Sequence, residues 1–158
     1  MIKSARQWHS FVLLSVCALA LTACTYTSDY GTPASEQEII NHISGKSSVG
    51  ANGGSYYAAD GTLKLYRKTP DISFYGTGTW SVRGKELVMQ SSGLAKKNGK
   101  IEAYSVGTYG VFVIIRSDGS FILKEPGSIG ASANPYNAPT KGFVFEKEFN
   151  SMRREFGG

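Results

Sequence analysis

Short runs of alternating apolar and polar residues make up most of the chain after residue 55. Leu63 and Leu65 form one such pair, and Leu87 and Met89 form another. A period of two places the apolar side chains on one face of a strand. The pattern predicts seven strands, over residues 55–59, 62–68, 72–82, 86–91, 101–116, 120–124 and 141–149.

Turn dipeptides separate these runs, among them Asp60-Gly61, Asn98-Gly99 and Asp118-Gly119. Such pairs favour tight hairpins because they readily adopt positive φ. Consecutive strands joined by hairpins form an antiparallel meander. We therefore expect a mainly β fold, a small closed or half-open barrel, with a β-sandwich as the alternative.

The run from Val111 to Ile115 is apolar on both strand faces, which predicts the most buried strand of the sheet. The apolar faces predict one core that buries four large side chains together: Trp80, Phe112, Ile114 and Phe143. The Gly-, Ser-, Asn- and Pro-rich residues 126–139 predict a long loop.

One short helix is predicted over residues 36–44. Ser35 and Glu38 have the spacing of a capping box, and Gly45 supplies a stop. Three isoleucines give the helix an apolar face that would cover one end of the sheet: Ile39, Ile40 and Ile43. The domain is expected to span residues 35–150, followed by a flexible tail over 151–158.

The first 23 residues have the order of a secretory signal peptide. Lys3 and Arg6 precede an apolar run of about 11 residues, within the ~7–15 typical of a signal core and short of the ~20 that span a bilayer. Small residues then precede Cys24.

The end of this segment, Leu21-Thr22-Ala23-Cys24, resembles the lipobox of bacterial envelope lipoproteins. The resemblance implies cleavage before Cys24, acyl chains on this residue, and residues 24–34 as a lipidated tether. Two or more acyl chains give durable membrane anchoring. Thr25, in place of Asp, implies the inner leaflet of the outer membrane, facing the periplasm. The alternative is an ordinary signal cut after Ala23 that leaves a free thiol.

Composition narrows the chemistry of the mature chain. Removing residues 1–23 leaves 135 residues with 15 basic and 12 acidic side chains, a net charge of +3 spread without a basic stripe, which argues against nucleic acid as a partner. Of the two cysteines, Cys17 lies in the signal and Cys24 would carry lipid. A disulfide, thiol catalysis and thiolate metal sites are therefore not expected.

Catalytic candidates are few. His42 is the one histidine after the signal, and no Gly-x-Ser-x-Gly or Ser-x-x-Lys motif occurs. Glu86 and Glu102 could face each other across strands as a glycosidase pair. We expect no catalytic residues, no metal and no cofactor apart from the covalent lipid, so the chain is not expected to be an enzyme.

Nine tyrosines make up the clearest excess in the composition. Tyrosine combines apolar area with a polar tip and suits binding surfaces, although aromatic residues are also common in strands. The candidate ligand- or partner-binding residues are Tyr56, Tyr75, Trp80, Tyr104 and Tyr109.

Two motifs, Tyr57-Ala58-Ala59-Asp60-Gly61 and Gly78-Thr79-Trp80-Ser81-Val82, resemble a group of uncharacterised small secreted bacterial proteins. The resemblance covers roughly residues 36–115 and implies no activity. The expected function is binding of an envelope protein or a small apolar ligand. The alternatives are an envelope hydrolase that acts on peptidoglycan or lipid through a carboxylate pair, and a structural subunit of an envelope assembly.

The lipobox gives a first prediction. Cys24→Ser removes the sulfur that would carry the acyl chains, so the variant is expected to leave the membrane fraction or to accumulate as an unprocessed precursor. Fractionation and mass measurement check this outcome. A processed variant that stays with membranes like the wild type would contradict lipid attachment at Cys24.

Overall fold

A computed structural model describes residues 31–127 and 135–157 of the 158-residue chain. The predicted signal peptide, Cys24 and the tether up to residue 30 lie outside the described residues. The same holds for the middle of the predicted loop over 126–139 and for Gly158.

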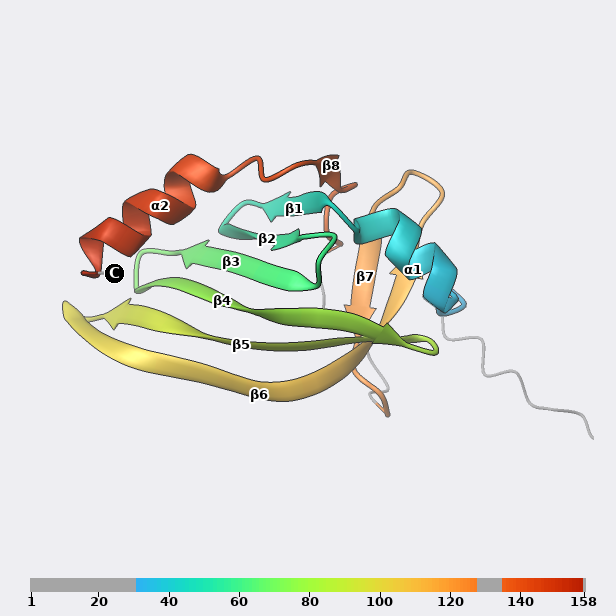
Figure 1. Cartoon of the computed structure of the whole chain (residues 1–158), viewed down its shortest axis with the longest axis horizontal. Helices are drawn as coiled ribbons and strands as arrows, with labels where there is room; N and C mark the ends of the chain where they lie inside the picture. Colours follow the sequence, from blue (N-terminus) through green and yellow to red (C-terminus); the bar gives the residue numbers. More distant parts are fainter. Residues whose placement is uncertain (1–30, 128–134, 158) are drawn as a thin grey trace, which may run out of the picture.

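The described strands form a single antiparallel sheet that curls into a half-barrel (Figure 1). The predicted mainly β meander with a half-open barrel and an N-terminal helix is confirmed. Along the sheet the strands follow the order β7-β6-β5-β4-β3-β2-β1-β8. Their bounds are β1 Lys46–Gly50, β2 Gly53–Tyr57, β3 Thr62–Lys68, β4 Ile72–Arg83, β5 Glu86–Lys97, β6 Lys100–Ile115, β7 Phe121–Lys124 and β8 Thr140–Lys141.

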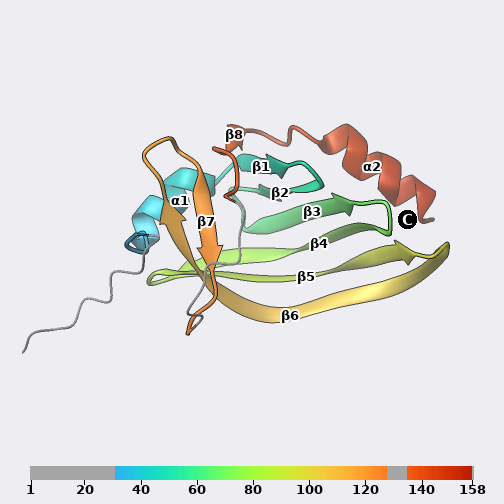
Figure 2. The same cartoon turned by 180° about the vertical axis from the view of Figure 1, so that it is seen from behind.

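The half-barrel is closed at one end and open at the other. At the closed end Tyr136 pairs with Phe121 of β7, and β8 pairs with β1, so the segment from Tyr136 to Lys141 links the two edges of the sheet. At the open end β6 extends far beyond the short β7, which pairs only with its last four residues. The two opposite views show the same long, bent β6 (Figures 1 and 2).

Glycines permit a tight bend where β4 and β5 face each other. A Cβ atom on Gly78 would lie 1.9 Å from the Gln90 carbonyl oxygen, and one on Gly93 would lie 1.9 Å from that of Tyr75. No L side chain fits at these separations, so the two backbones approach as only glycine allows.

The predicted helix forms as α1, Glu36–Ile43, with both hydrogen bonds of its capping box. The Glu38 amide donates to Ser35 Oγ, and the Ser35 amide donates to the Glu38 carboxylate at 2.8 Å. Ile39 and Ile43 are fully buried and close the end of the half-barrel. They pack into the inner core with Tyr57, Leu63, Trp80, Leu87, Met89, Val111, Val113 and Phe121.

A second helix, α2 (Glu146–Glu155), replaces the predicted strand over residues 141–149, which is therefore wrong beyond Lys141. Phe145, Phe149 and Met152 form one helical face, because their spacing of four and three residues matches the helical period. Residues expected as a tail supply the last turns of this helix, and Phe156 is also buried.

Helix α2 lies on the outer face of the sheet, so the molecule has two cores. Its aromatic side chains contact Tyr66 and Tyr75 of β3 and β4. The expectation of one shared core for the four large side chains is wrong. Trp80 lies in the inner core and Phe143 in the outer one, Ile114 is buried on the outer face, and Phe112 is only half-buried.

The close approach of β4 and β5 gives a stability prediction. Gly93→Ala places a methyl group against the Tyr75 carbonyl and is expected to lower the free energy of unfolding by about 1–3 kcal/mol. Gly107→Ala is the matched control, because no atom lies within 4 Å of a Cβ there, and its effect should stay within about 0.5 kcal/mol. Urea unfolding measures both, and equal midpoints would contradict the tight bend.

Candidate functional site

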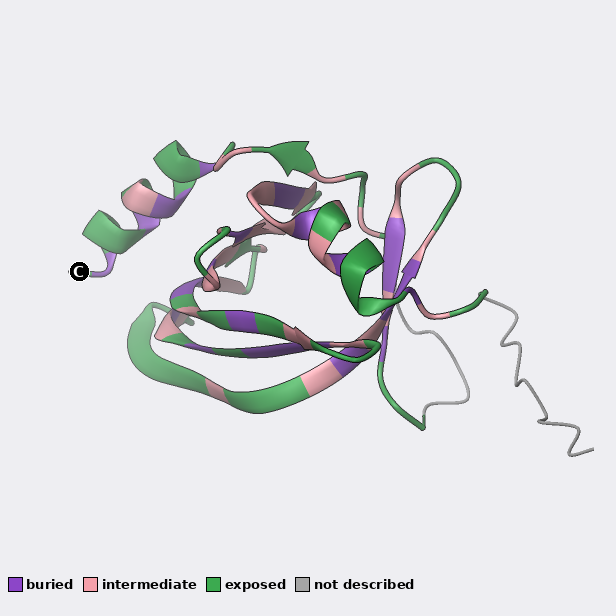
Figure 3. Cartoon of the chain, turned by 45° about the vertical axis from the view of Figure 1, so that its right-hand side comes forward, coloured by how far each residue is buried: buried purple, intermediate pink, exposed green. Residues whose placement is uncertain are grey.

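The exposed aromatic residues of the sheet gather on the inner face of its open end. Tyr104 pairs with Gly93, and Tyr109 pairs with Met89 of the inner core, so both rings point to the inner side. Tyr104 is 48% exposed and Tyr109 43% exposed, although the same face is filled by the inner core at the closed end. Figure 3 shows the first part of β6 in the colour of exposed residues.

Tyr104 rests against Phe74, whose ring lies edge-on with centroids 5.1 Å apart. Phe74 is buried, and its ring lies over Gly76. Gly76 and Gly93 face each other across β4 and β5, so no side chain rises between these rings and the backbone. The result is a smooth apolar surface with a tyrosine hydroxyl at its border.

Three tyrosines lie close enough to Tyr109 for their hydroxyl groups to interact electrostatically with its own: Tyr57, Tyr104 and Tyr136. Burial raises the pKa of Tyr109, and the nearby hydroxyls of Tyr136 and Tyr104 raise it further. Tyr57 is wholly buried edge-on against Trp80, and burial followed by Tyr136 raises its pKa strongly. The phenol of Tyr109 therefore stays neutral at physiological pH and can donate a hydrogen bond on an otherwise apolar face.

The remaining predicted binding residues lie elsewhere. Tyr56 stacks on Phe143 on the outer face, with ring centroids 4.9 Å apart. Tyr75 is buried under α2, and Trp80 is buried in the inner core, where its Nε1–H donates to the Ala58 carbonyl at 2.8 Å. The structure thus brings Tyr104 and Tyr109 together on the inner face, which they share with the buried Trp80, whereas Tyr56 and Tyr75 lie on the outer face. Cys24 lies outside the described residues.

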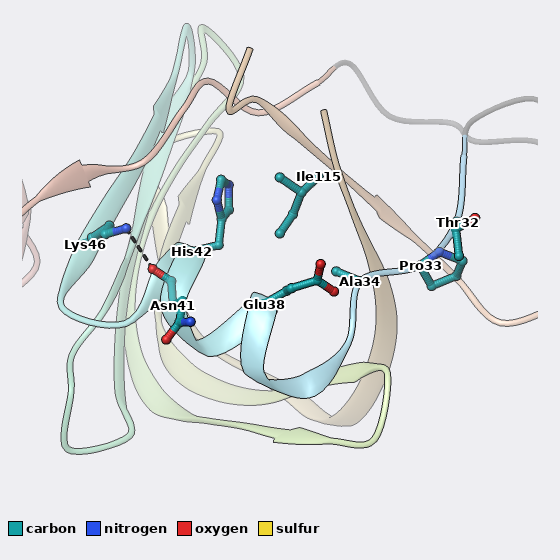
Figure 4. Close-up of a pocket in the computed structure, with 8 residues that line it drawn as sticks. All are labelled: Thr32, Pro33, Ala34, Glu38, Asn41, His42, Lys46 and Ile115. Atoms are coloured by element: carbon teal, nitrogen blue, oxygen red, sulfur yellow. Dashed lines mark hydrogen bonds between the residues drawn. The ribbon is translucent and has the colours of Figure 1, made fainter. Parts of the chain in front are cut away.

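A hollow of about 510 Å³ lies beside α1 at the closed end (Figure 4). Several polar groups around it already have partners. Glu38 belongs to the capping box, and Lys46 Nζ donates to the Asn41 carbonyl at 2.9 Å. A second hollow of about 500 Å³ lies mainly on the outer face, lined by Tyr75, Ser92 and Ala103 and bordered by Tyr104. Both hollows are shallow, and neither gathers convergent reactive groups.

His42 borders the hollow beside α1 and is half-buried, with its ring edge-on to Phe121 at 5.5 Å. Its Nε2 atom is buried and has no hydrogen-bond partner within the described part of the chain. Burial and then the charge of Lys46 lower its pKa, against the opposing effect of a hydrogen bond with the Gly119 backbone. The ring is therefore a neutral packing element.

The proposed carboxylate pair does not form. Glu86 pairs with Phe112 and points to the outer face, whereas Glu102 pairs with Ala95 on the inner face. Nine residues of β5 separate these positions, about 30 Å at the rise of a strand, far beyond the ~5–9.5 Å of glycosidase carboxylates. Over residues 31–127 and 135–157, no three His, Cys, Asp or Glu side chains gather where they could hold a metal ion.

No helix among the described residues is both long and apolar enough to cross a membrane. Comparisons with protein-family models, curated proteins and solved structures find no match to this chain. Among the described residues, the exposed inner face around Tyr104 and Tyr109 is the strongest candidate site.

His42 gives a prediction for the pH dependence of stability. Its pKa is lowered in the folded state, so the unfolded chain binds a proton first as pH falls below 6.5. The free energy of unfolding is expected to decrease from pH 7 to pH 5, and His42→Gln should flatten this slope. The pKa values of the Glu38 and Glu155 carboxylates are lowered from 4.5, so these groups change the free energy of unfolding mainly below pH 5. Equal slopes in urea titrations would contradict the prediction.

Proposed function

We propose that this chain is a non-catalytic, lipid-anchored envelope protein that binds an apolar ligand on the inner face of its half-barrel. The lipobox at Cys24 supports the anchor, and Thr25 supports a place at the inner leaflet of the outer membrane, facing the periplasm. The ligand would lie against Tyr104, Tyr109 and Phe74.

The observation that carries this proposal is the exposure of two tyrosine rings on the inner face of the sheet. Inner faces of small β-barrels are usually filled by their own side chains. Here the closed end is filled by Trp80, Met89 and α1, whereas the open end has glycines in place of filling residues. Aromatic rings with a few polar tips on a concave face are typical of small-molecule sites.

The alternative of a hydrolase has little support in this geometry. Its two carboxylates lie on opposite faces of the sheet, and the neutral His42 packs against Phe121 at the far, closed end. Neither arrangement brings an acid and a base to one substrate position.

A protein partner is the second candidate, and the open edge of β6 favours it. β7 pairs with β6 only from Phe112 onward, and no other described strand occupies that edge along residues 100–111. An unpaired edge offers backbone groups to an extended segment of another chain. Ile101 on the outer face and Tyr104 on the inner face would flank such an added strand.

One pair of variants separates the two candidates. Tyr104→Ala is expected to raise the Kd for the neutral apolar dye N-phenyl-1-naphthylamine by about tenfold, equivalent to ~1.4 kcal/mol. Ile101→Ala removes a side chain of similar exposure from the opposite face of the same strand and should leave this Kd unchanged. Fluorescence titration measures both.

If the dye binds and Tyr104→Ala has no effect, the inner-face site is wrong. If instead an envelope protein is recovered with the wild type, and both substitutions weaken its capture equally, strand addition along β6 is the function. Circular dichroism of each variant verifies that the fold is retained.

A further inference from the structure

Basic side chains stand on the inner face at the mouth of the open end. Arg67 pairs with Phe74 across β3 and β4, and Lys97 pairs with both Ile72 and Lys100. Residues that pair directly across neighbouring strands point to the same face of a sheet, and successive residues along a strand alternate between faces. Arg67, Lys97 and Lys100 therefore lie on the inner face, together with Phe74 and Tyr104. We call these three residues the basic rim, and all three are exposed.

The alternation is supported independently by the outer face. Lys96, next to Lys97, makes an ion pair of 2.8 Å with Glu155 of α2, which packs on the outer side. Lys96 and Lys97 therefore point to opposite faces of the sheet. The hairpin that carries Lys97 and Lys100 is the predicted Asn98-Gly99 turn, with positive φ at both residues, which fixes the two lysines side by side.

The charge of the described chain is concentrated at this end. The ends of β3 and β5, the start of β6 and the last turn of α2 meet there (Figure 1). Three acidic residues at this end, Asp71, Glu102 and Glu155, stand against seven basic ones, Arg67, Lys68, Lys96, Lys97, Lys100, Arg153 and Arg154. The other described residues carry eight basic and eight acidic side chains, so the positive excess belongs to the open end.

From the rim inward, the same face changes from charged to apolar. Behind Lys97 and Lys100 come Ala95 and Glu102, with Phe74 beside Ala95, then Tyr104, and then Val106 and the buried Ser91. Glu102 is the one acidic side chain that the described register places in this stretch of the inner face. The stretch of β5 from Lys97 to Ser91 covers six residue steps, about 20 Å. One acyl chain fills half of a ~30 Å bilayer core and therefore spans about 15 Å.

We propose that the ligand of the inner face is an acyl lipid with an anionic head group, which rests on the function proposed above. Its chain lies over Phe74 and Tyr104, and its carboxylate or phosphate lies among the basic rim. Lysine and arginine stems can pack along the chain while their charged ends meet the head group. A neutral apolar ligand would use only half of this surface.

The test compares three ligands by isothermal titration calorimetry at low ionic strength: laurate, dodecanol and acetate. The protein is the chain from residue 24 with Cys24→Ser, which keeps every described residue and carries no acyl chain of its own. Laurate is expected to bind at least tenfold more tightly than dodecanol, and acetate should show no binding. The preference for laurate should shrink in 0.5 M salt because exposed charges are screened.

Two variants assign the preference to the rim. Lys97→Gln combined with Lys100→Gln should abolish the preference for laurate and leave the Kd for dodecanol unchanged. Lys68→Gln is the matched control, because this lysine lies at the same end but, by the register, on the outer face, and it should leave the preference intact.

The outcomes separate the two proposals. Equal affinity for laurate and dodecanol would overturn the anionic head group and leave the apolar site standing. A preference that survives loss of Lys97 and Lys100 would overturn the rim as its origin. If neither long-chain ligand binds, both this inference and the proposed apolar site are overturned.

Discussion

Backbone crowding between β4 and β5 is the constraint on which the rest of the molecule depends. Gly78 and Gly93 sit where a Cβ atom would meet a carbonyl oxygen of the neighbouring strand at 1.9 Å. Glycines at such points let a sheet bend sharply, so the strands can wrap around Trp80 and Tyr57 at one end. The same glycines leave the inner face bare beside Tyr104. The curvature of the sheet and the exposure of its aromatic rings therefore have one physical origin.

The two helices stabilise opposite faces, and this division leaves the open end uncovered. α1 inserts Ile39 and Ile43 into the closed end of the half-barrel. α2 packs its apolar face against the outer side of β3 and β4, where Phe149 meets Tyr75 edge-on at 5.7 Å. With that face occupied, α2 has no apolar surface left for the inner side. Tyr104 and Tyr109 consequently have no helix of the described chain to bury them.

Local signals in the sequence predicted α1, the Asn98-Gly99 hairpin and the half-open meander, because capping boxes and positive-φ turns act within a few residues. They missed β1, where Ser47 and Ser48 are buried without an apolar pattern and Ser47 Oγ donates to the distant Gly142 carbonyl at 2.6 Å.

Around α2, phenylalanines spaced by two residues suggested a strand. Extending the window to Met152 and Phe156 would have given the helical spacing. For the site, the composition pointed to tyrosines but not to their positions in the sheet. Only the strand register shows that Tyr104 lies on the inner face and Tyr75 on the outer face. Register is a property of the whole sheet, so short sequence patterns do not reveal it.

The closed and open ends have different relations to the proposed anchor. Gly31, the first described residue, approaches Ile114 near the end of β6, so the chain enters the domain beside its closed end. The seven residues from Cys24 to Tyr30 span at most about 25 Å when fully extended. The basic rim lies at the opposite end of β6, a strand of 16 residues and therefore about 50 Å long if straight. With the proposed anchor, acyl chains on Cys24 would thus lie on the side of α1, and the rim would face away from the membrane. In this arrangement, a lipid bound at the rim would arrive from the side that faces away from the membrane.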